Sequence, residues 1–262
     1  MNILEKIIAH KRIEVAARKE KISIQELEEK PLFSKAPTSL KASLKDNSKT
    51  GIIAEYKRKS PSKGIINGTA AVEEVVRDYT AFGASGISVL TDADFFGGDL
   101  TDLEKAAFVN VPLLRKDFTI DEYQLVEAKA YGASVILLIA ACLTPEEVKH
   151  LAGTAKNLGL EVLLELHDEI ELEYINHSID LVGINNRNLK TFTVDLEQSV
   201  KLANQIGNGY IKVAESGISD VADIQYLKQY GFDGFLIGEN FMKQAHPGAA
   251  FKAFAESLTA QK

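Results

Sequence analysis

Two charged residues stand near the end of the first β-rich run of the chain. The run 52–58 begins with apolar residues, carries Glu55 and Lys57, and is broken soon afterwards by Ser60 and Pro61. Because side chains two apart in a strand point to the same face, Glu55 and Lys57 should project together. A buried strand tolerates such charges when they face each other or a ligand. The pair therefore indicates either a reactive site or a surface ion pair.

Further polar side chains close the later β-rich runs. They are Lys116, Glu165, Asn185 and Glu215, each preceded by apolar neighbours. If these side chains meet on one ring, lysines and carboxylates in mutual contact would shift each other's pKa toward values useful for proton transfer. The pattern predicts acid–base chemistry and is difficult to explain as surface decoration.

Small residues end the last two runs. Ser216-Gly217 and Gly238 stand where exposed backbone amides could approach an anion. Ordinary turn glycines are the alternative. In a barrel of parallel strands, however, phosphate is bound by the loops after strands 7 and 8 and by a short helix N-terminus, which favours a phosphate site here.

A repeated unit predicts how these residues are positioned. From Gly51 onward a β-rich run, a polar break, an amphipathic helix and a glycine recur. Several of the runs are apolar on both faces, as expected of parallel strands covered by helices. We predict a (β/α)8 TIM barrel, with an open doubly wound sheet as the alternative. The eight expected strands are 52–58, 86–91, 111–116, 134–140, 161–166, 181–186, 210–215 and 234–238. The barrel should form one domain over residues 1–262, with 1–49 as a helical N-terminal extension.

Composition narrows the function classes. The 262 residues carry a formal net charge of −7 and a pI near 5.4, which argues against nucleic acid as a partner. No apolar stretch is long enough to suggest a membrane helix. Cys142 is the single cysteine and is expected to pack in the core of a protein from a reducing compartment. We expect a cytoplasmic protein that binds a small molecule and neither nucleic acid nor membrane. We expect a monomer, with an oligomer as the alternative.

The sequence gives little support for a metal site or for a catalytic histidine. No cluster of His, Cys and Asp has metal-ligand spacing, so no metal site is predicted. His167 follows Glu165 by two residues but adjoins a loop, and we interpret it as a helix-start residue rather than a catalytic base. The absence of a G-x-S-x-G elbow removes the usual signal of a serine hydrolase.

These segments resemble a known family. Ile53–Ser62, Leu114–Phe118, Glu165–Asp168, Ile184–Leu189 and Ala214–Ile218 are similar to indole-3-glycerol phosphate synthase, as are Ile3–Val15 and Leu90–Gly98. The resemblance covers nearly the whole chain in order. It implies a carboxy-lyase of tryptophan biosynthesis that closes the indole ring of 1-(2-carboxyphenylamino)-1-deoxyribulose 5-phosphate, releases carbon dioxide and water, and needs no cofactor.

The resemblance also implies roles for single residues. Lys116 would be the general acid of ring closure, Glu165 the base of dehydration, and Lys57 the partner of the substrate carboxylate and the acid for the leaving hydroxyl. Glu55, Asn185 and Glu215 would orient these groups, and Arg187 would anchor the anthranilate end. An apolar wall is expected from Phe96 and Leu138, although Leu138 could equally be barrel core. Phosphate would rest on the backbone amides of Ser216, Gly217, Gly238 and Glu239.

The chain differs from the usual family sequence at two places, and two other functions are alternatives to this interpretation. Glu239-Asn240 replaces the serine-leucine usual in the family before Met242, and Asp99 stands where serine is common. Phosphoribosylanthranilate isomerase, a related barrel, would need a cysteine on strand 1 and an aspartate on strand 6, where this chain has Glu55/Lys57 and Asn185. A non-catalytic phosphosugar-binding barrel would have no reason to combine Lys57, Lys116 and Glu165. Whether the N-terminal segment closes over the site or only packs on the barrel stays open.

Overall fold

Eight parallel strands close into a barrel in this computed structural model, which describes residues 3–187 and 193–260. The strands run around the barrel in chain order, and β1 pairs with both β4 and β10 to close it. This arrangement confirms the predicted (β/α)8 class and excludes the open sheet. The strands are β1 (Ile52–Tyr56), β4 (Gly86–Leu90), β5 (Leu113–Lys116), β6 (Val135–Ile139), β7 (Glu161–Leu166), β8 (Leu181–Asn185), β9 (Ile211–Glu215) and β10 (Phe232–Ile237).

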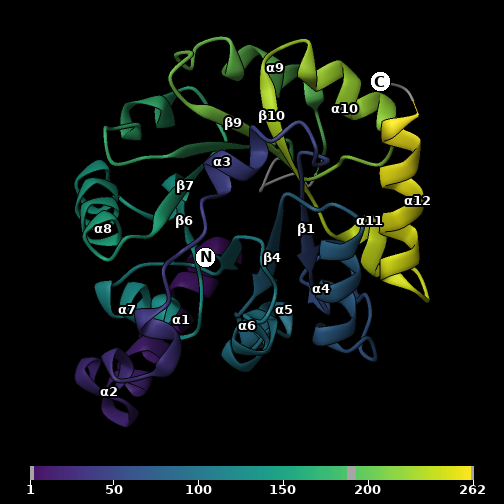
Figure 1. The fold of residues 1–262 in the computed structure, drawn as a ribbon. Coiled ribbons are helices and arrows are strands. Elements are labelled where there is room, and N and C mark those ends of the chain that lie inside the picture. The colour runs from purple at the N-terminus through teal and green to yellow at the C-terminus, as the bar shows by residue number, and fades with distance from the viewer. Residues whose placement is uncertain (1–2, 188–192, 261–262) are drawn as a thin grey trace.

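Helices surround the strands (Figure 1). Four predicted helix starts or ends carry the expected signals: Thr144 forms a capping box with Glu147, and Gly83, Gly132 and Gly231 have the positive φ of a left-handed helix end. The helices are α4 (Val72–Ala81), α5 (Ala93–Phe96), α6 (Leu100–Ala106), α7 (Glu122–Ala130), α8 (Pro145–Asn157), α9 (Leu196–Ala203), α10 (Val221–Lys228), α11 (Glu239–Met242) and α12 (Pro247–Thr259).

Three local features depart from the simple repeat. A short 3-10 helix, η3 (Ile170–Tyr174), stands between β7 and β8 where an α-helix was expected, and η2 (Ala140–Cys142) precedes α8. The segment after β1, interpreted as a plain break, forms a small antiparallel hairpin of β2 (Lys59–Ser60) and β3 (Gly64–Ile65). The hairpin lies next to Lys57 and therefore shapes the rim of the barrel.

The core has two layers because strand residues alternate between the barrel interior and the helical shell. The interior is packed by Ile53, Leu114, Leu137, Leu163, Val213 and Leu236, together with two leucines of α3 (Leu40–Leu44). Outside the strands, a larger apolar cluster packs beneath the helices. The interior is thus filled at one end, which leaves the opposite, carboxyl end of the strands for a cavity.

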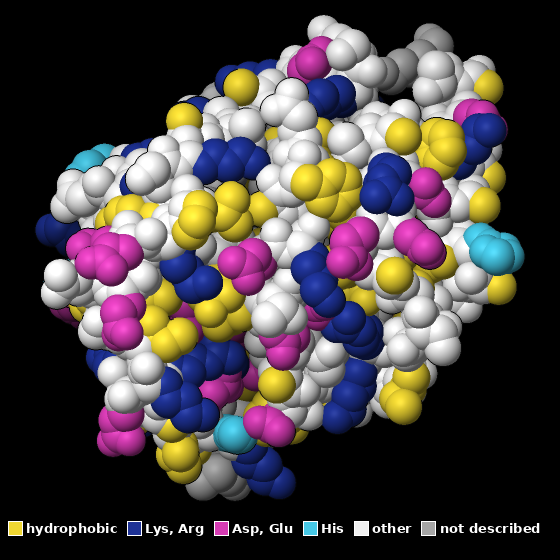
Figure 2. Space-filling model, turned by 60° about the horizontal axis from the view of Figure 1, so that its bottom comes forward, with side chains coloured by type: hydrophobic (Ala, Val, Ile, Leu, Met, Phe, Trp, Pro, Cys, Tyr) yellow, Lys and Arg dark blue, Asp and Glu magenta, His cyan; other side chains and the backbone are white. Residues whose placement is uncertain are grey.

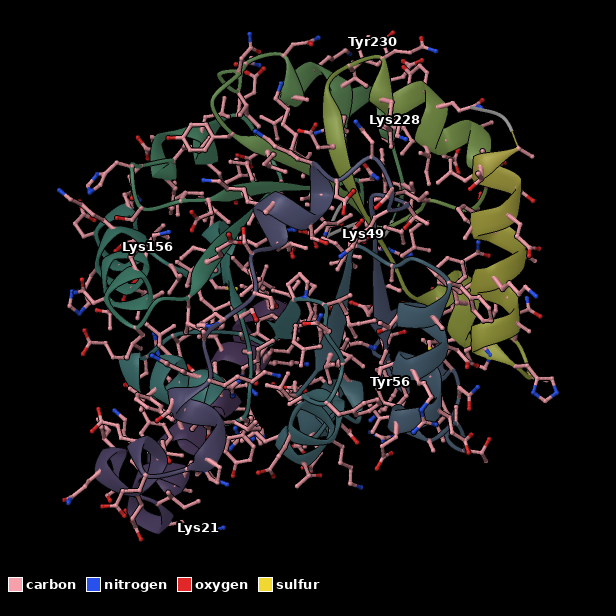
Figure 3. The ribbon with its side chains drawn as sticks, viewed as in Figure 1. Lys21, Lys49, Tyr56, Lys156, Lys228 and Tyr230 are labelled. Atoms are coloured by element: carbon pink, nitrogen blue, oxygen red, sulfur yellow. The ribbon has the colours of Figure 1, made fainter. Side chains whose placement is uncertain are left out.

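The N-terminal segment is helical. It forms α1 (Ile3–Lys21), α2 (Ile24–Glu28), the 3-10 helix η1 (Pro31–Ser34) and α3. The first two helices lie beside α7, and α3 lies in front of the barrel (Figure 1). Glu161 holds α3 there by accepting from the backbone amide of Leu40 at 2.8 Å, and Lys49, labelled in Figure 3, donates to Ser43 Oγ at 2.8 Å. The segment therefore closes the amino end of the barrel through α3.

The described part of the chain contains no helix that is both long and apolar enough to cross a bilayer. Basic and acidic side chains are interspersed over the face drawn in Figure 2.

Candidate active site

A cavity of about 320 Å³ opens at the carboxyl ends of the strands. Most of the residues predicted from the sequence line it: Glu55, Lys57, Phe96, Lys116, Glu165, Asn185, Arg187, Glu215, Ser216, Gly217, Gly238 and Glu239. They come from seven of the eight strand ends or the loops that follow. The folding of separate β-rich runs into one barrel is what brings these residues together.

Leu138 is the exception. It is fully buried and belongs to the outer apolar cluster, under the helices. Its neighbours Leu137 and Ile139 point into the barrel and line the cavity instead. Because adjacent residues of a strand face opposite sides, Leu138 belongs to the barrel core, the alternative that the sequence left open, and does not form the apolar wall.

Glu55 and Lys57 form an ion pair inside the cavity. Lys57 Nζ lies 2.6 Å from Glu55 Oε1, and the two side chains are 18% and 4% exposed. Burial to this degree excludes the surface ion pair that the sequence left open. Glu55 is also packed against Gly238, where an added Cβ would lie 2.5 Å from Glu55 Oε1. A glycine at 238 therefore leaves room for this carboxylate.

Lys116 is the centre of a second ionic group. Its Nζ lies 3.0 Å from Glu165 Oε2 and 3.6 Å from Glu215 Oε2. Asn185 Nδ2 donates to the other oxygen of Glu165 at 2.9 Å. These contacts fix the carboxylate of Glu165 from both sides and leave one ammonium between two acids.

The pKa values in this group move apart. Burial lowers the pKa of Lys116, but Glu165, Glu215 and Glu55 outweigh burial and raise it above its usual value. Burial raises the pKa of Glu165, yet Lys116 and its hydrogen-bond partners hold it well below the usual range. Burial and the neighbouring carboxylate of Glu165 raise the pKa of Glu215 to about 8. Such a separation of two neighbouring carboxyl groups is typical of sites that move protons.

The opposite rim of the cavity is built from tight turns. Ser216 and Gly217 both have positive φ, 66° and 73°, and Asn186 Nδ2 holds the turn by donating to Ser216 O at 2.7 Å. Gly238 precedes the short helix α11, which begins at Glu239. Consecutive left-handed residues and a helix start both turn backbone amides toward one side, which suits an anion.

Sequence reasoning missed the part of the wall that comes from α1. Ile3, Leu4 and Ile7 line the cavity. Phe118, which follows β5, adds a ring whose centroid lies 6.1 Å from that of Phe96. The apolar spacing of α1 was visible in the sequence, but a helix pattern alone does not reveal which surface the apolar face covers.

A buried charge attaches α1 to the barrel. Lys11 is 1% exposed, and its Nζ lies 2.8 Å from Glu14, from Asp92 after β4 and from Asp117 after β5. Arg115 extends the group by contacting Asp117 at 3.1 Å. Lys11, Glu14, Asp92 and Arg115 do not line the cavity, whereas Asp117 does, next to Lys116.

His167 is placed differently from its interpretation as a helix-start residue. η3 begins three residues later, at Ile170. The ring of His167 instead lies next to Glu165, with Nε2 3.2 Å from Oε1. The sequence did indicate this contact, because residues two apart in a strand point to the same face, and His167 follows Glu165 by two.

The described ranges 3–187 and 193–260 contain no group of three or more His, Cys, Asp and Glu residues suited to holding a metal ion. Asn188 and Leu189, the last residues of the motif after β8, lie outside these ranges.

Similarity to solved structures extends the fold assignment. The alpha subunit of tryptophan synthase from Legionella pneumophila str. Paris has a TM-score of 0.60 at 14% identity, covering 84% of this chain and 95% of that one. The 3-hexulose-6-phosphate synthase from Salmonella typhimurium has a TM-score of 0.58 at 11% identity, covering 80% and 99%. At these identities the similarity supports the barrel fold alone.

Sequence relatives are much closer. A protein named indole-3-glycerol phosphate synthase from Bacteroides thetaiotaomicron is 52% identical over 98% of this chain and 99% of its own length. Proteins of the same name from Koribacter versatilis and Polynucleobacter necessarius are each 42% identical over 95% of this chain and 97% of their own. The family model for indole-3-glycerol phosphate synthase matches residues 4–254. The chain therefore belongs to the indole-3-glycerol phosphate synthase family.

Proposed function

We propose that this chain converts 1-(2-carboxyphenylamino)-1-deoxyribulose 5-phosphate into indole-3-glycerol phosphate, as a carboxy-lyase of tryptophan biosynthesis. The observation that carries the proposal is the buried Lys116, held between Glu165 and Glu215 in a cavity that a second ammonium, Lys57, also lines. Family membership supplies the reaction, and this arrangement supplies an acid and a base within one cavity. A barrel that only binds a phosphosugar has no use for either group.

The first step, ring closure, requires a general acid, and we assign this role to Lys116. An aromatic carbon attacks the ketone carbon of the substrate, and the ketone oxygen becomes negatively charged. An ammonium positioned at that oxygen stabilises the charge and delivers its proton, which gives a hydroxyl group. Lys116 suits this step because the surrounding carboxylates keep it protonated until the oxygen becomes basic.

Loss of carbon dioxide and water completes the reaction. Breaking the carboxylate bond returns its electron pair to the ring, and a second proton converts the hydroxyl into departing water. We assign the acid of this step to Lys57 and the base that removes the ring-carbon proton to Glu165, which Asn185 orients. Two protons are delivered and one is removed, so each turnover takes one proton from solvent.

Binding roles follow from the cavity walls. Phe96 and the apolar residues of α1 would contact the anthranilate ring, and Arg187 would bind its carboxylate end, with Glu55 and Glu215 orienting the lysines and substrate hydroxyls. We assign the phosphate to the backbone amides of Ser216, Gly217, Gly238 and Glu239. Because backbone amides supply these contacts, the replacement of a family serine by Glu239 need not remove the phosphate site.

We further expect a monomer that works in the cytoplasm on this small molecule. Light scattering after gel filtration measures the molecular mass, and a value near twice 28.7 kDa would contradict the monomer.

Indole fluorescence tests the reaction directly. The chain contains no tryptophan, so an indole signal after mixing with the substrate arises from product. We expect Lys116→Ala and Glu165→Gln each to lose about 10² to 10⁴ of the turnover rate, the range usual for an acid or base. Lys252→Ala, at a half-exposed side chain of α12, serves as the matched control and should keep wild-type turnover.

One result of the same experiment would contradict the proposed reaction. If the folded wild type gives no signal but inorganic phosphate still binds, the chain is a phosphosugar-binding barrel and the proposed reaction is wrong.

A further inference from the structure

His167 lies between two carboxylates. Its Nε2 is 3.2 Å from Glu165 Oε1, and its Nδ1 is 3.7 Å from Glu171 Oε2. The ring is 11% exposed, and the two carboxylate side chains are 4% and 11% exposed. Glu171 also accepts from the backbone amide of His167 at 2.5 Å, which fixes the position of the residue after β7.

The charge of the ring follows from this geometry. A neutral imidazole carries one N–H and one acceptor nitrogen, so one of its nitrogens would present a lone pair to a carboxylate. With a carboxylate on each side, the doubly protonated ring is favoured. Burial lowers the pKa of His167, but the two carboxylates outweigh burial and raise it to about 10.

Other titratable groups around the ring do not reverse this result. Cys142 of η2 is close enough to Glu165 and Glu171 that, together with burial, they raise the pKa of its thiol, so the thiol stays neutral. Lys116 of β5 lies on the far side of Glu165. Glu165 therefore has two cationic neighbours, one that gives up its proton in the proposed mechanism and one that does not.

After ring closure, Glu165 needs a second cation beside it in order to stay ionised. Once Lys116 has released its proton, a neutral amine faces Glu165, and the carboxyl group of Glu215, whose pKa is raised to about 8 by burial and by Glu165, stands near the same amine. A proton moving onto Glu165 at this stage would destroy the base before dehydration. We propose that His167 is a positioning residue whose imidazolium, held between Glu165 and Glu171, keeps Glu165 ionised and oriented after Lys116 has released its proton. This inference rests on the proposed function for the role of Glu165.

Nuclear magnetic resonance of the wild type tests the charge without any activity. The chain has five histidines, and His167→Gln identifies the side-chain ¹⁵N signals of position 167 by their disappearance. We expect both ring nitrogens to keep imidazolium shifts up to pH 8 or above. A ring that becomes neutral below pH 8 overturns the proposal.

Kinetics test the consequence. In His167→Gln we expect the acid limb of the kcat profile to move to higher pH by at least one unit, so that kcat falls at least tenfold at pH values on this limb, with KM changed less than twofold. His167→Lys retains a cation and should keep the limb within half a unit of wild type. His150→Gln is the matched control, because His150 also contacts a carboxylate, Glu122 at 2.6 Å, but is 68% exposed.

The outcomes separate a charge from a packing role. An acid limb that does not move in His167→Gln overturns the proposal, as does a limb that moves equally in His167→Lys. If the wild type has no turnover, the proposed function fails by itself. The ¹³C carboxyl signal of Glu165 then replaces kinetics: a titration midpoint that is unchanged in His167→Gln overturns the inference.

Discussion

Lys11 is the residue whose replacement should most clearly separate a buried ion pair from an exposed one. Its ammonium lies 2.8 Å from three carboxylates, two of which belong to barrel loops. Lys11→Met keeps the length of the side chain but removes the charge. Asp92 and Asp117 are then left buried without this partner, which in proteins costs about 3–5 kcal/mol.

The structure favours the lower end of that range. Asp117 keeps Arg115 at 3.1 Å, and Asp92 keeps two backbone amides at the start of α5. We therefore expect a loss of about 3 kcal/mol in the free energy that holds α1 on the barrel. Lys19→Met is the matched control, since Lys19 also joins α1 to the barrel, through Asp121 at 2.7 Å, but is 45% exposed. Such exposed pairs contribute about 0–1 kcal/mol.

Hydrogen exchange of the α1 amides measures this free energy. A loss of about 3 kcal/mol corresponds to exchange roughly 100-fold faster in Lys11→Met, while Lys19→Met should change it less than about fivefold. The substrate KM should also rise in Lys11→Met, because Ile3, Leu4 and Ile7 of α1 line the cavity. Equal exchange in the two variants would refute the idea that the buried charge holds α1 in place.

Three further predictions concern the cavity. The pKa of Glu215 is 4.5 in the unfolded chain and about 8 in the folded one, so the free energy of unfolding should fall as the pH rises from 4.5 to 8, by up to about 1.4 kcal/mol per pH unit. In urea titrations Glu215→Gln should remove this pH dependence, and identical pH slopes in the variant and the wild type would contradict the shift. Gly183→Ala places a Cβ 2.1 Å from Glu215 Oε1 and should lower kcat at least tenfold; unchanged kcat would show that the carboxylate position is unimportant. Gly217→Ala, at φ 73° and with Val194 2.2 Å from the new Cβ, should weaken inhibition by inorganic phosphate at least tenfold, whereas Gly153→Ala, with open space around it, should not; equal inhibition constants would argue against phosphate at this turn.

The strands were predictable because their physical signal is local. Each of the eight apolar runs forms a barrel strand, and the main errors are at the ends. The third run was expected to begin at 111, but β5 begins at Leu113, after Pro112, which has no backbone N–H to donate. The residues after β7 show the opposite case, because their acidic, aromatic sequence gave no warning of the 3-10 helix η3.

In a strand without charged residues, it was harder to predict which side chains point into the barrel and which point toward the helices. On β5 and β7, Lys116 and Glu165 identify the side that faces the cavity. β6 is apolar on both faces, so its sequence does not distinguish Leu138 from Leu137 and Ile139. The ambiguity at Leu138 is therefore inherent in a strand buried on both sides.

Lys11 illustrates the other limit of sequence reasoning. A lysine between apolar positions of an amphipathic helix is normally expected to reach solvent. Here Ile7, Lys11 and Val15 form one buried stripe of α1, and the carboxylates that make burial of the ammonium possible come from loops distant in the sequence. Only the tertiary arrangement supplies the reason for the residue.

The two ionic groups on either side of β5 are parts of one arrangement. Lys116 points into the cavity, while its neighbours Arg115 and Asp117 face the charges that hold α1. Since α1 supplies part of the cavity wall, the same strand fixes both the proposed general acid and the helix that lines the cavity. A disturbance of Asp117 would therefore reach Lys116 through one peptide unit and the cavity wall through Lys11. Asp117 joins the two groups directly, because it lines the cavity and also contacts the buried Lys11.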